Sequence, residues 1–149
     1  MTLKEVIKIM EAVASRQPSI NMVVENDLFR LNSRADARYG VFAFVQGQHS
    51  ASVDSSAISY QFTLFYVDRL TNDRSNQIEI QSVGIETLDN IIRQLDELGI
   101  YSDSSYTFQV FNQRFLDECA GVFCNVTFEV PVGTMCAEDF ETDEDVIVY

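Results

Sequence analysis

The chain has 149 residues, of which 46% are hydrophobic, and 11 of them are phenylalanine. A chain of this size and composition can bury the core of one domain, which argues against disorder. Its formal net charge of −13, from 23 acidic and 10 basic side chains, would repel nucleic-acid backbones and anionic lipids. The composition therefore argues against a protein that binds nucleic acid or membranes through a basic surface.

The cysteine content and the first residues predict the cellular compartment. Three cysteines, an odd number, do not make a complete disulfide framework and favour a reducing environment. Residues 1–5 open a charged amphipathic pattern instead of an export signal. No apolar run approaches the roughly 20 residues that a membrane-spanning helix needs. We therefore expect synthesis in a cytoplasm and no insertion into a membrane.

The N-terminal segment predicts a helix followed by a short strand. Thr2 can cap a helix with Glu5 three residues later, and apolar side chains then recur at helical spacing. Pro18 ends this pattern. Residues 20–25 could form a strand, so the chain would begin with one helix packed on a sheet.

Basic side chains are concentrated at the start of the chain. Residues 1–40 carry six basic and five acidic side chains, whereas the remainder carries four basic and eighteen acidic ones. This asymmetry favours head-to-tail contacts between copies. Residues 26–38 are interpreted as a loop or an arm whose arginines donate across a subunit interface: Arg30, Arg34 and Arg38. Two alternatives stay open, that these are ordinary surface arginines and that the acidity only keeps the protein dissolved.

Residues 39–67 predict two strands joined by an extended hairpin. Residues 39–45 are almost wholly apolar, and residues 46–55 are polar and small. From Ile58 onward polar and apolar side chains alternate, and the segment becomes apolar on both faces toward Val67. The hairpin is therefore expected to project beyond the domain body and to offer its polar tip to a neighbour. The candidate interface residues at this tip are Gln46, Gln48 and His49. A plain solvent loop is an equally compatible interpretation.

The second half of the chain predicts a long helix and two more strands. Asn76 with Glu79 repeats the capping pattern, and apolar residues recur at helical spacing up to Gly99. Gly84 weakens the first turns, so the helix is expected to bend or begin afresh there. A short strand at 106–111 and a half-buried strand at 122–130 complete the pattern.

The order of these elements is α-ββ-α-ββ. It predicts an α+β fold with a largely antiparallel sheet, two helices packed on one face and an extended hairpin. Residues 1–133 would form a single domain, and residues 134–149 an acidic C-terminal tail. The tail is typically a solvated segment, although its apolar end could lie on another subunit.

No set of side chains carries a catalytic or metal-binding signature. His49 is the single histidine, and no acid that would orient it beside a cysteine is evident. Cys119 and Cys124, five apart on one strand, would point to opposite faces and cannot bind zinc together. Buried structural cysteine is the better interpretation. The acids are too numerous for any pair to be informative, and no glycine-rich phosphate loop occurs. We expect no enzymatic activity, no cofactor and no metal.

Two central segments carry a resemblance to a known family. They are FTLFYVDRL at residues 62–70 and NQIEIQSVGIETL at residues 76–88, followed by a closing pair of strands. In the sequence of these segments, and in element order, size and acidity, the chain resembles the tail-terminator and tail-completion proteins of tailed bacteriophages, especially the ring proteins of crAss-like phage tails. The resemblance covers roughly residues 1–132. The acidic tail lies outside it.

The resemblance implies a virion protein without enzymatic activity. It implies a homo-oligomeric ring, six- or twelve-fold, at the head–tail junction or in the tail, in contact with neighbouring portal, connector and tail proteins. DNA would pass through its lumen without specific binding, and an acidic surface lets a polyanion slide. The competing interpretation is a monomeric or dimeric adaptor that binds a protein or a small ligand. An enzyme that uses Cys119 or a carboxylate pair is a third.

Overall fold

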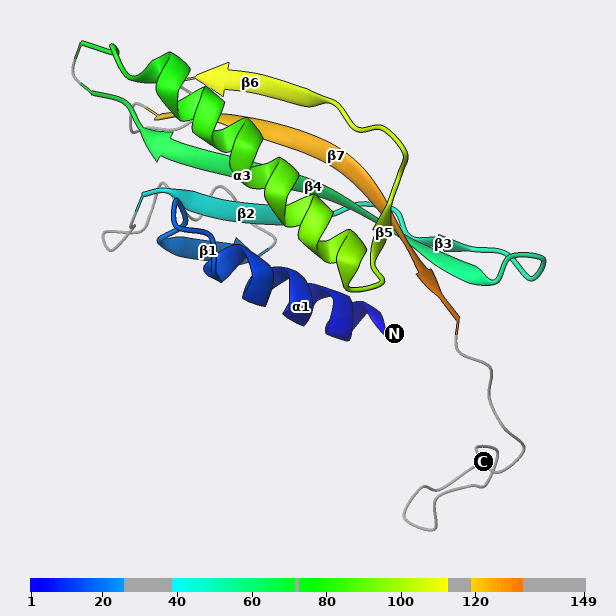
Figure 1. Ribbon diagram of the computed structural model, residues 1–149. Coiled ribbons are helices and arrows are strands. Elements are labelled where there is room, and N and C mark those ends of the chain that lie inside the picture. The colour runs from blue at the N-terminus through cyan, green and yellow to red at the C-terminus, as the bar shows by residue number, and fades with distance from the viewer. Residues whose placement is uncertain (26–38, 72, 113–118, 133–149) are drawn as a thin grey trace, which may run out of the picture.

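The computed structural model describes residues 1–25, 39–71, 73–112 and 119–132. These residues form two helices and a seven-stranded sheet, drawn in Figure 1. The strands are β1 Met22–Glu25, β2 Val41–Gln46, β3 Ser50–Ala51, β4 Ala57–Arg69, β5 Tyr101–Ser102, β6 Phe108–Asn112 and β7 Cys119–Pro131. The helices are α1 Leu3–Ser15 and α3 Gln77–Glu97. The predicted α+β fold is therefore confirmed.

The sheet has the order β1-β2-β4-β7-β5. In addition, β3 pairs with β4, and β6 pairs with β7. Within it β1 and β2 are parallel, and the other pairs are antiparallel. Its centre is the ladder between β4 and β7, which runs without interruption from Ala57 opposite Pro131 to Arg69 opposite Cys119. The predicted, largely antiparallel sheet is thus organised around two long neighbouring strands.

Helix α1 begins where the sequence predicts. The Glu5 backbone N–H donates to Thr2 Oγ1 over 3.2 Å, and the Thr2 N–H donates to a Glu5 carboxylate oxygen over 3.0 Å. This reciprocal capping box satisfies two of the N–H groups that a helix start leaves without partners. The stripe of Val6, Met10 and Val13 is buried and fixes which side of α1 faces the sheet.

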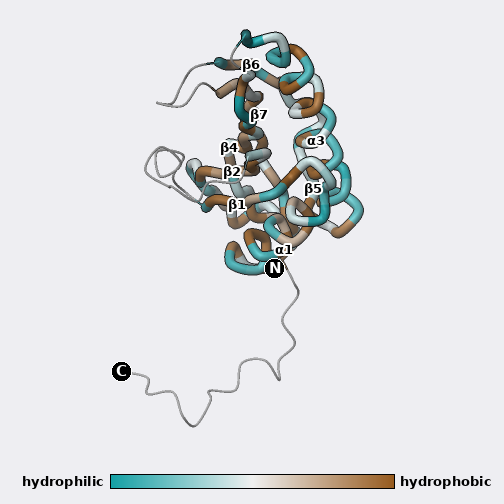
Figure 2. Tube along the Cα trace, turned by 90° about the vertical axis from the view of Figure 1, so that its left-hand side faces the viewer, coloured by the Kyte–Doolittle hydropathy of each residue, from teal (hydrophilic) through white to brown (hydrophobic). Residues whose placement is uncertain are grey.

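Both helices pack on the same face of the sheet. Their apolar stripes share one core cluster with alternate side chains of β2, β4 and β7, including Phe44, Phe62 and Val126. Figure 2 shows α3 beside one face of the stacked strands, with hydrophobic stretches running through them. The opposite face carries a second apolar cluster, to which Val41, Val67 and Phe111 belong. The central part of the sheet is therefore apolar on both sides.

Helix α3 differs from the prediction at its first turn. The side chain of Asn76 does not cap the helix. Its Oδ1 instead accepts the backbone N–H of Thr71 over 2.9 Å, and its Nδ2 donates to the carbonyl of Arg69 over 3.2 Å. The capping prediction was wrong because the connection from β4 competes for the same amide.

Gly84 does not interrupt α3, which is one helix from Gln77 to Glu97. A Cβ at Gly84 would lie 2.9 Å from ring carbon Cδ1 of Tyr66 and 2.9 Å from Cγ2 of Val122. The glycine therefore lets the helix approach β4 and β7 closely, and this contact outweighs its low helix propensity.

Candidate functional site

The two described cysteines are fully buried on opposite sides of the sheet, as predicted. Cys119 belongs to the cluster on the face opposite the helices, and Cys124 belongs to the cluster under the helices. Burial, and secondarily the charge of Asp89, raises the pKa of Cys124 to about 11. Its thiol is therefore protonated near neutral pH and unsuited to act as a nucleophile. Among residues 1–25, 39–71, 73–112 and 119–132, no group of three or more metal-ligating side chains occurs.

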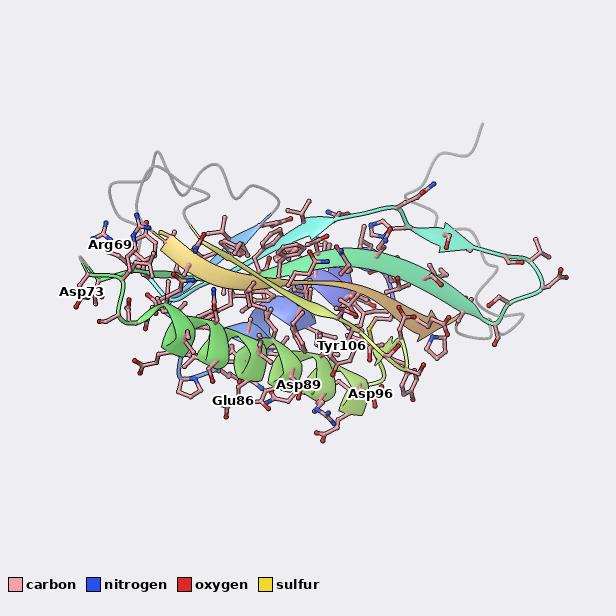
Figure 3. All side chains as sticks on the ribbon, turned by 90° about the horizontal axis from the view of Figure 1, so that it is seen from above. Arg69, Asp73, Glu86, Asp89, Asp96 and Tyr106 are labelled. Atoms are coloured by element: carbon pink, nitrogen blue, oxygen red, sulfur yellow. The ribbon has the colours of Figure 1, made fainter. Side chains whose placement is uncertain are left out.

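The best-defined cluster of ionisable groups connects α3 to the segment before β6. The Tyr106 hydroxyl donates to Asp89 over 2.6 Å, and the Arg93 guanidinium contacts the other oxygen of that carboxylate over 2.7 Å (Figure 3). Burial opposes ionisation of Asp89, but these two partners outweigh it and hold its pKa below the usual value. Burial first and the Asp89 contact second raise the pKa of Tyr106 to about 12. Near neutral pH, Asp89 therefore stays ionised and Tyr106 stays protonated. Their hydrogen bond attaches the segment before β6 to α3.

The base of the hairpin is organised around Gln61 of β4. Its backbone carbonyl accepts the Gly47 N–H over 2.7 Å, and its side-chain oxygen accepts the Gln48 N–H over 3.1 Å. Its own N–H donates to Nδ1 of His49 over 3.2 Å. One residue of β4 thus binds three consecutive residues of the connection, which fixes the direction in which the chain leaves β2.

His49 lies at this base and not in an exposed tip. Its ring is partly buried, with ring centroids 5.3 Å from Tyr60 and 5.7 Å from Phe62. Because Nδ1 accepts from Gln61, Nε2 carries the proton and donates to the side-chain oxygen of Gln46 over 3.1 Å. The structure therefore brings the predicted residues Gln46, Gln48 and His49 together at the base of the hairpin, where Gln46 and His49 are partly buried and Gln48 is exposed.

The part of the hairpin that projects is residues 50–57, which we call the hairpin arm. Figures 1 and 3 show β3 and the start of β4 extending past the ends of both helices. The Ser55 N–H donates to the Ser52 carbonyl over 3.1 Å, and the Asp54 N–H donates to Ser52 Oγ over 3.3 Å. Between them Val53 is fully exposed, with a relative accessibility of 103%. The turn thus presents one apolar side chain and one carboxylate to the exterior.

The remaining predicted interface residues are Arg30, Arg34 and Arg38, and these lie outside the described residues. The tail at 134–149 also lies outside them. Sequence reasoning singled out the hairpin but missed Val53 and Asp54. The available signal was an isolated valine within a run of serine, alanine and aspartate, because a turn seldom gains from a large apolar side chain.

A groove of about 500 Å³ runs along α1 beside the edge strand β1. Leu3 and Ile7 form its apolar floor and are partly buried against the core. Lys4 and Lys8 stand on its wall and are exposed, and neither forms an ion pair with any described residue. At its far end burial, together with the charge of Glu25, raises the pKa of Glu11. The groove therefore has an apolar and basic end near the N-terminus.

The outward side of α3 is acidic. Glu86 and Asp96 point away from the sheet in Figure 3, and the other exposed acids of this helix are Glu79 and Glu97. Arg93 is the single basic residue of α3, and it is bound to Asp89. This helix therefore presents net negative charge along its 21 residues.

A scan of the chain against protein-family models gave no match, and a search of curated proteins gave none either. No helix in the described parts of the chain combines the length and apolar character needed to cross a bilayer.

Proposed function

We propose that this chain is a non-enzymatic structural protein of a tailed-phage virion. In this proposal it forms an oligomeric ring at the head–tail junction or in the tail, where it lines or extends the DNA conduit and joins neighbouring connector and tail components. The attribution to phages rests on the sequence resemblance of residues 62–70 and 76–88. The attribution to an assembly rests on the shape and charge of the molecule.

The observation that carries the assembly role is the hairpin arm. The fully exposed valine side chain at the turn of this projecting ribbon contributes nothing to the fold of a monomer, because it contacts only solvent. The base of the arm is nevertheless fixed by three hydrogen bonds to Gln61. An element that is held in one direction and exposes an apolar tip is suited to reach an adjacent subunit.

The charge of α3 supports the conduit role. Its exposed acids would repel the DNA backbone, so a lumen lined by α3 would let DNA pass with low affinity. Reversing two of them, Glu86→Lys with Asp96→Lys, should introduce salt-sensitive DNA binding without unfolding the domain, because both side chains are exposed. Wild-type protein should show no measurable binding to duplex DNA at physiological salt. Tight binding by the wild type would contradict the conduit role.

The test of the proposal is native mass combined with imaging. Light scattering over a range of concentrations, followed by electron microscopy of any large species, should reveal closed rings. Mass spectrometry of purified phage particles from a culture that produces the protein should detect it there. A monomer at every concentration that is also absent from particles would overturn the proposal and favour the adaptor.

A further inference from the structure

We propose that the hairpin arm of one copy docks in the α1–β1 groove of a second copy. This inference rests on the proposed ring and names the contact that would build it. It commits each subunit to one projecting patch and one receiving patch. A contact between two different patches is repeated head to tail and closes into a ring when the rotation between copies allows it.

The two surfaces are complementary in polarity. The arm offers Val53, and the groove offers the partly buried side chains of Leu3 and Ile7 as an apolar floor. Seating the valine there would remove its whole side chain from water. By transfer estimates, burial of a fully exposed valine side chain strengthens an association about tenfold or more, before the losses of association.

The N-terminal end of the groove is also complementary to the arm in charge, whereas Glu11 and Glu25 line its other end. Asp54 is the ionisable residue of the arm, and its carboxylate binds no described residue. Lys4 and Lys8 lie one helical turn apart on the groove wall without a partner among the described residues. On the arm, the Asp54 carboxylate is next to the apolar side chain of Val53. In the groove, the ammonium groups of the two lysines are next to the apolar floor, so each group on the arm has a suitable partner. Such matching governs the orientation and the specificity of an encounter.

The geometry makes the contact intermolecular. The arm extends past the N-terminal end of α1 (Figure 1), the helix whose side chains line most of the groove in the same subunit. Its base is held by Gln61, so it cannot fold back without breaking those hydrogen bonds. The receiving groove includes Glu25 of β1, which is an edge strand of the sheet formed by the described residues.

The first experiment compares assembly of Val53→Ser with that of Ile78→Ser by light scattering and microscopy. Ile78 is a matched control because it is also a largely exposed apolar residue, 78% accessible, but lies on the first turn of α3. Val53→Ser should raise the concentration needed for half-assembly about tenfold or more, and the control should leave it unchanged. Equal assembly of both variants and wild type would overturn the inference.

A charge exchange sharpens the test. Asp54→Lys and Lys8→Asp should each weaken assembly, and the double variant should recover it, because the pair is restored with opposite polarity. Asp103→Lys serves as a control for added positive charge at another exposed site. Failure of the double variant to recover any assembly would contradict a direct contact.

Crosslinking provides the direct readout. The background for this test replaces Cys136, the third cysteine of the chain, which lies outside the described residues, with serine. In it, Val53→Cys combined with Ile7→Cys should give a ladder of disulfide-linked multimers under oxidation, and each single variant should not. Rings that form normally without this ladder would refute the docking mode and leave the proposed function standing. Wild-type protein that neither forms rings nor occurs in phage particles would refute the proposed function itself.

Discussion

Both halves of β4 pair with β7 through the same ladder of backbone hydrogen bonds, but they differ in how many of their side chains are buried. From Phe62 to Val67 five of the six side chains are buried, on alternating faces, beneath the helices or in the second apolar cluster. From Ala57 to Gln61 a single side chain, Tyr60, is buried. The ladder with β7 nevertheless continues through both halves.

This difference shows that hydrogen bonding gives the ribbon its shape, whereas burial decides which part stabilises the fold. Apolar burial contributes roughly 25 cal/mol per Å², while a ladder hydrogen bond contributes about 1 kcal/mol net on average. The inner half of β4 is thus the centre of the domain. The outer half and β3 are a supported projection whose side chains remain free for contact.

The largest expected effect is in the inner half. Phe62→Ala removes a fully buried ring that contacts Phe44 and Phe128, and it should lower the free energy of unfolding by about 3–5 kcal/mol. Val53→Ala, its counterpart in the hairpin arm, should change that energy by less than about 0.5 kcal/mol. Urea denaturation monitored by circular dichroism measures both. Equal losses would remove the distinction between the two halves.

Two glycines test the same distinction through close packing. A Cβ at Gly121 would lie 2.0 Å from the backbone oxygen of Tyr66, so Gly121→Ala should cost about 2–3 kcal/mol through a forced backbone shift. At Gly47 the nearest atom is the side-chain oxygen of Gln61, 2.9 Å away, and this flexible side chain can move at the expense of its hydrogen bond with the exposed Gln48 N–H. Gly47→Ala should therefore cost less than about 1 kcal/mol. Thermal melts of both variants provide the comparison.

A smaller and pH-dependent effect is expected at the surface of the domain. Tyr106→Phe removes a hydrogen bond to the Asp89 carboxylate and should cost about 1 kcal/mol at neutral pH. Because the folded state lowers the pKa of Asp89, this carboxylate stabilises the fold above its ordinary pKa of 3.8. That stabilisation is lost as the pH falls through the lower pKa of the folded state.

The variant and the wild type should therefore converge in stability only once the pH falls below the pKa of Asp89 in the folded wild type, which lies under the ordinary value of 3.8. Denaturation curves between pH 2 and pH 7 measure this convergence. A constant difference over that range would mean that the Tyr106 hydroxyl acts independently of the charge on Asp89.

The smallest expected effect on stability belongs to Val53→Ser, whose importance should appear in assembly alone. Its unfolding free energy should lie within about 0.5 kcal/mol of the wild-type value, because the side chain is fully exposed. A large destabilisation would show that the arm is part of the folded core.

Elements with a strong period could be predicted from the sequence. The capping box at Thr2, the alternation in β4 and β7, and the long apolar stripe of α3 are all confirmed. Strands β3 and β5 escaped prediction because each has two residues, which is too short to show alternation.

Tertiary context overturned two local interpretations. The side chain of Asn76 accepts a hydrogen bond from Thr71 in the preceding loop. Gly84 allows close packing against Tyr66 and Val122, which are distant in sequence. At the candidate site the sequence located the hairpin but not the roles within it. His49 reads as an exposed polar residue in the sequence, and only the register of β4 places Tyr60 and Phe62 beneath it.

The positions of Cys119 and Cys124 give the protein two internal chemical reporters. Both cysteines belong to β7, but the Cys124 thiol is buried beneath the helices and the Cys119 thiol is buried on the opposite side of the sheet. Their alkylation rates in the folded protein measure how often each layer opens to solvent. Equal rates would mean that the domain opens as a single cooperative unit. Faster labelling of one thiol would identify the layer that detaches first, including during incorporation into a larger particle.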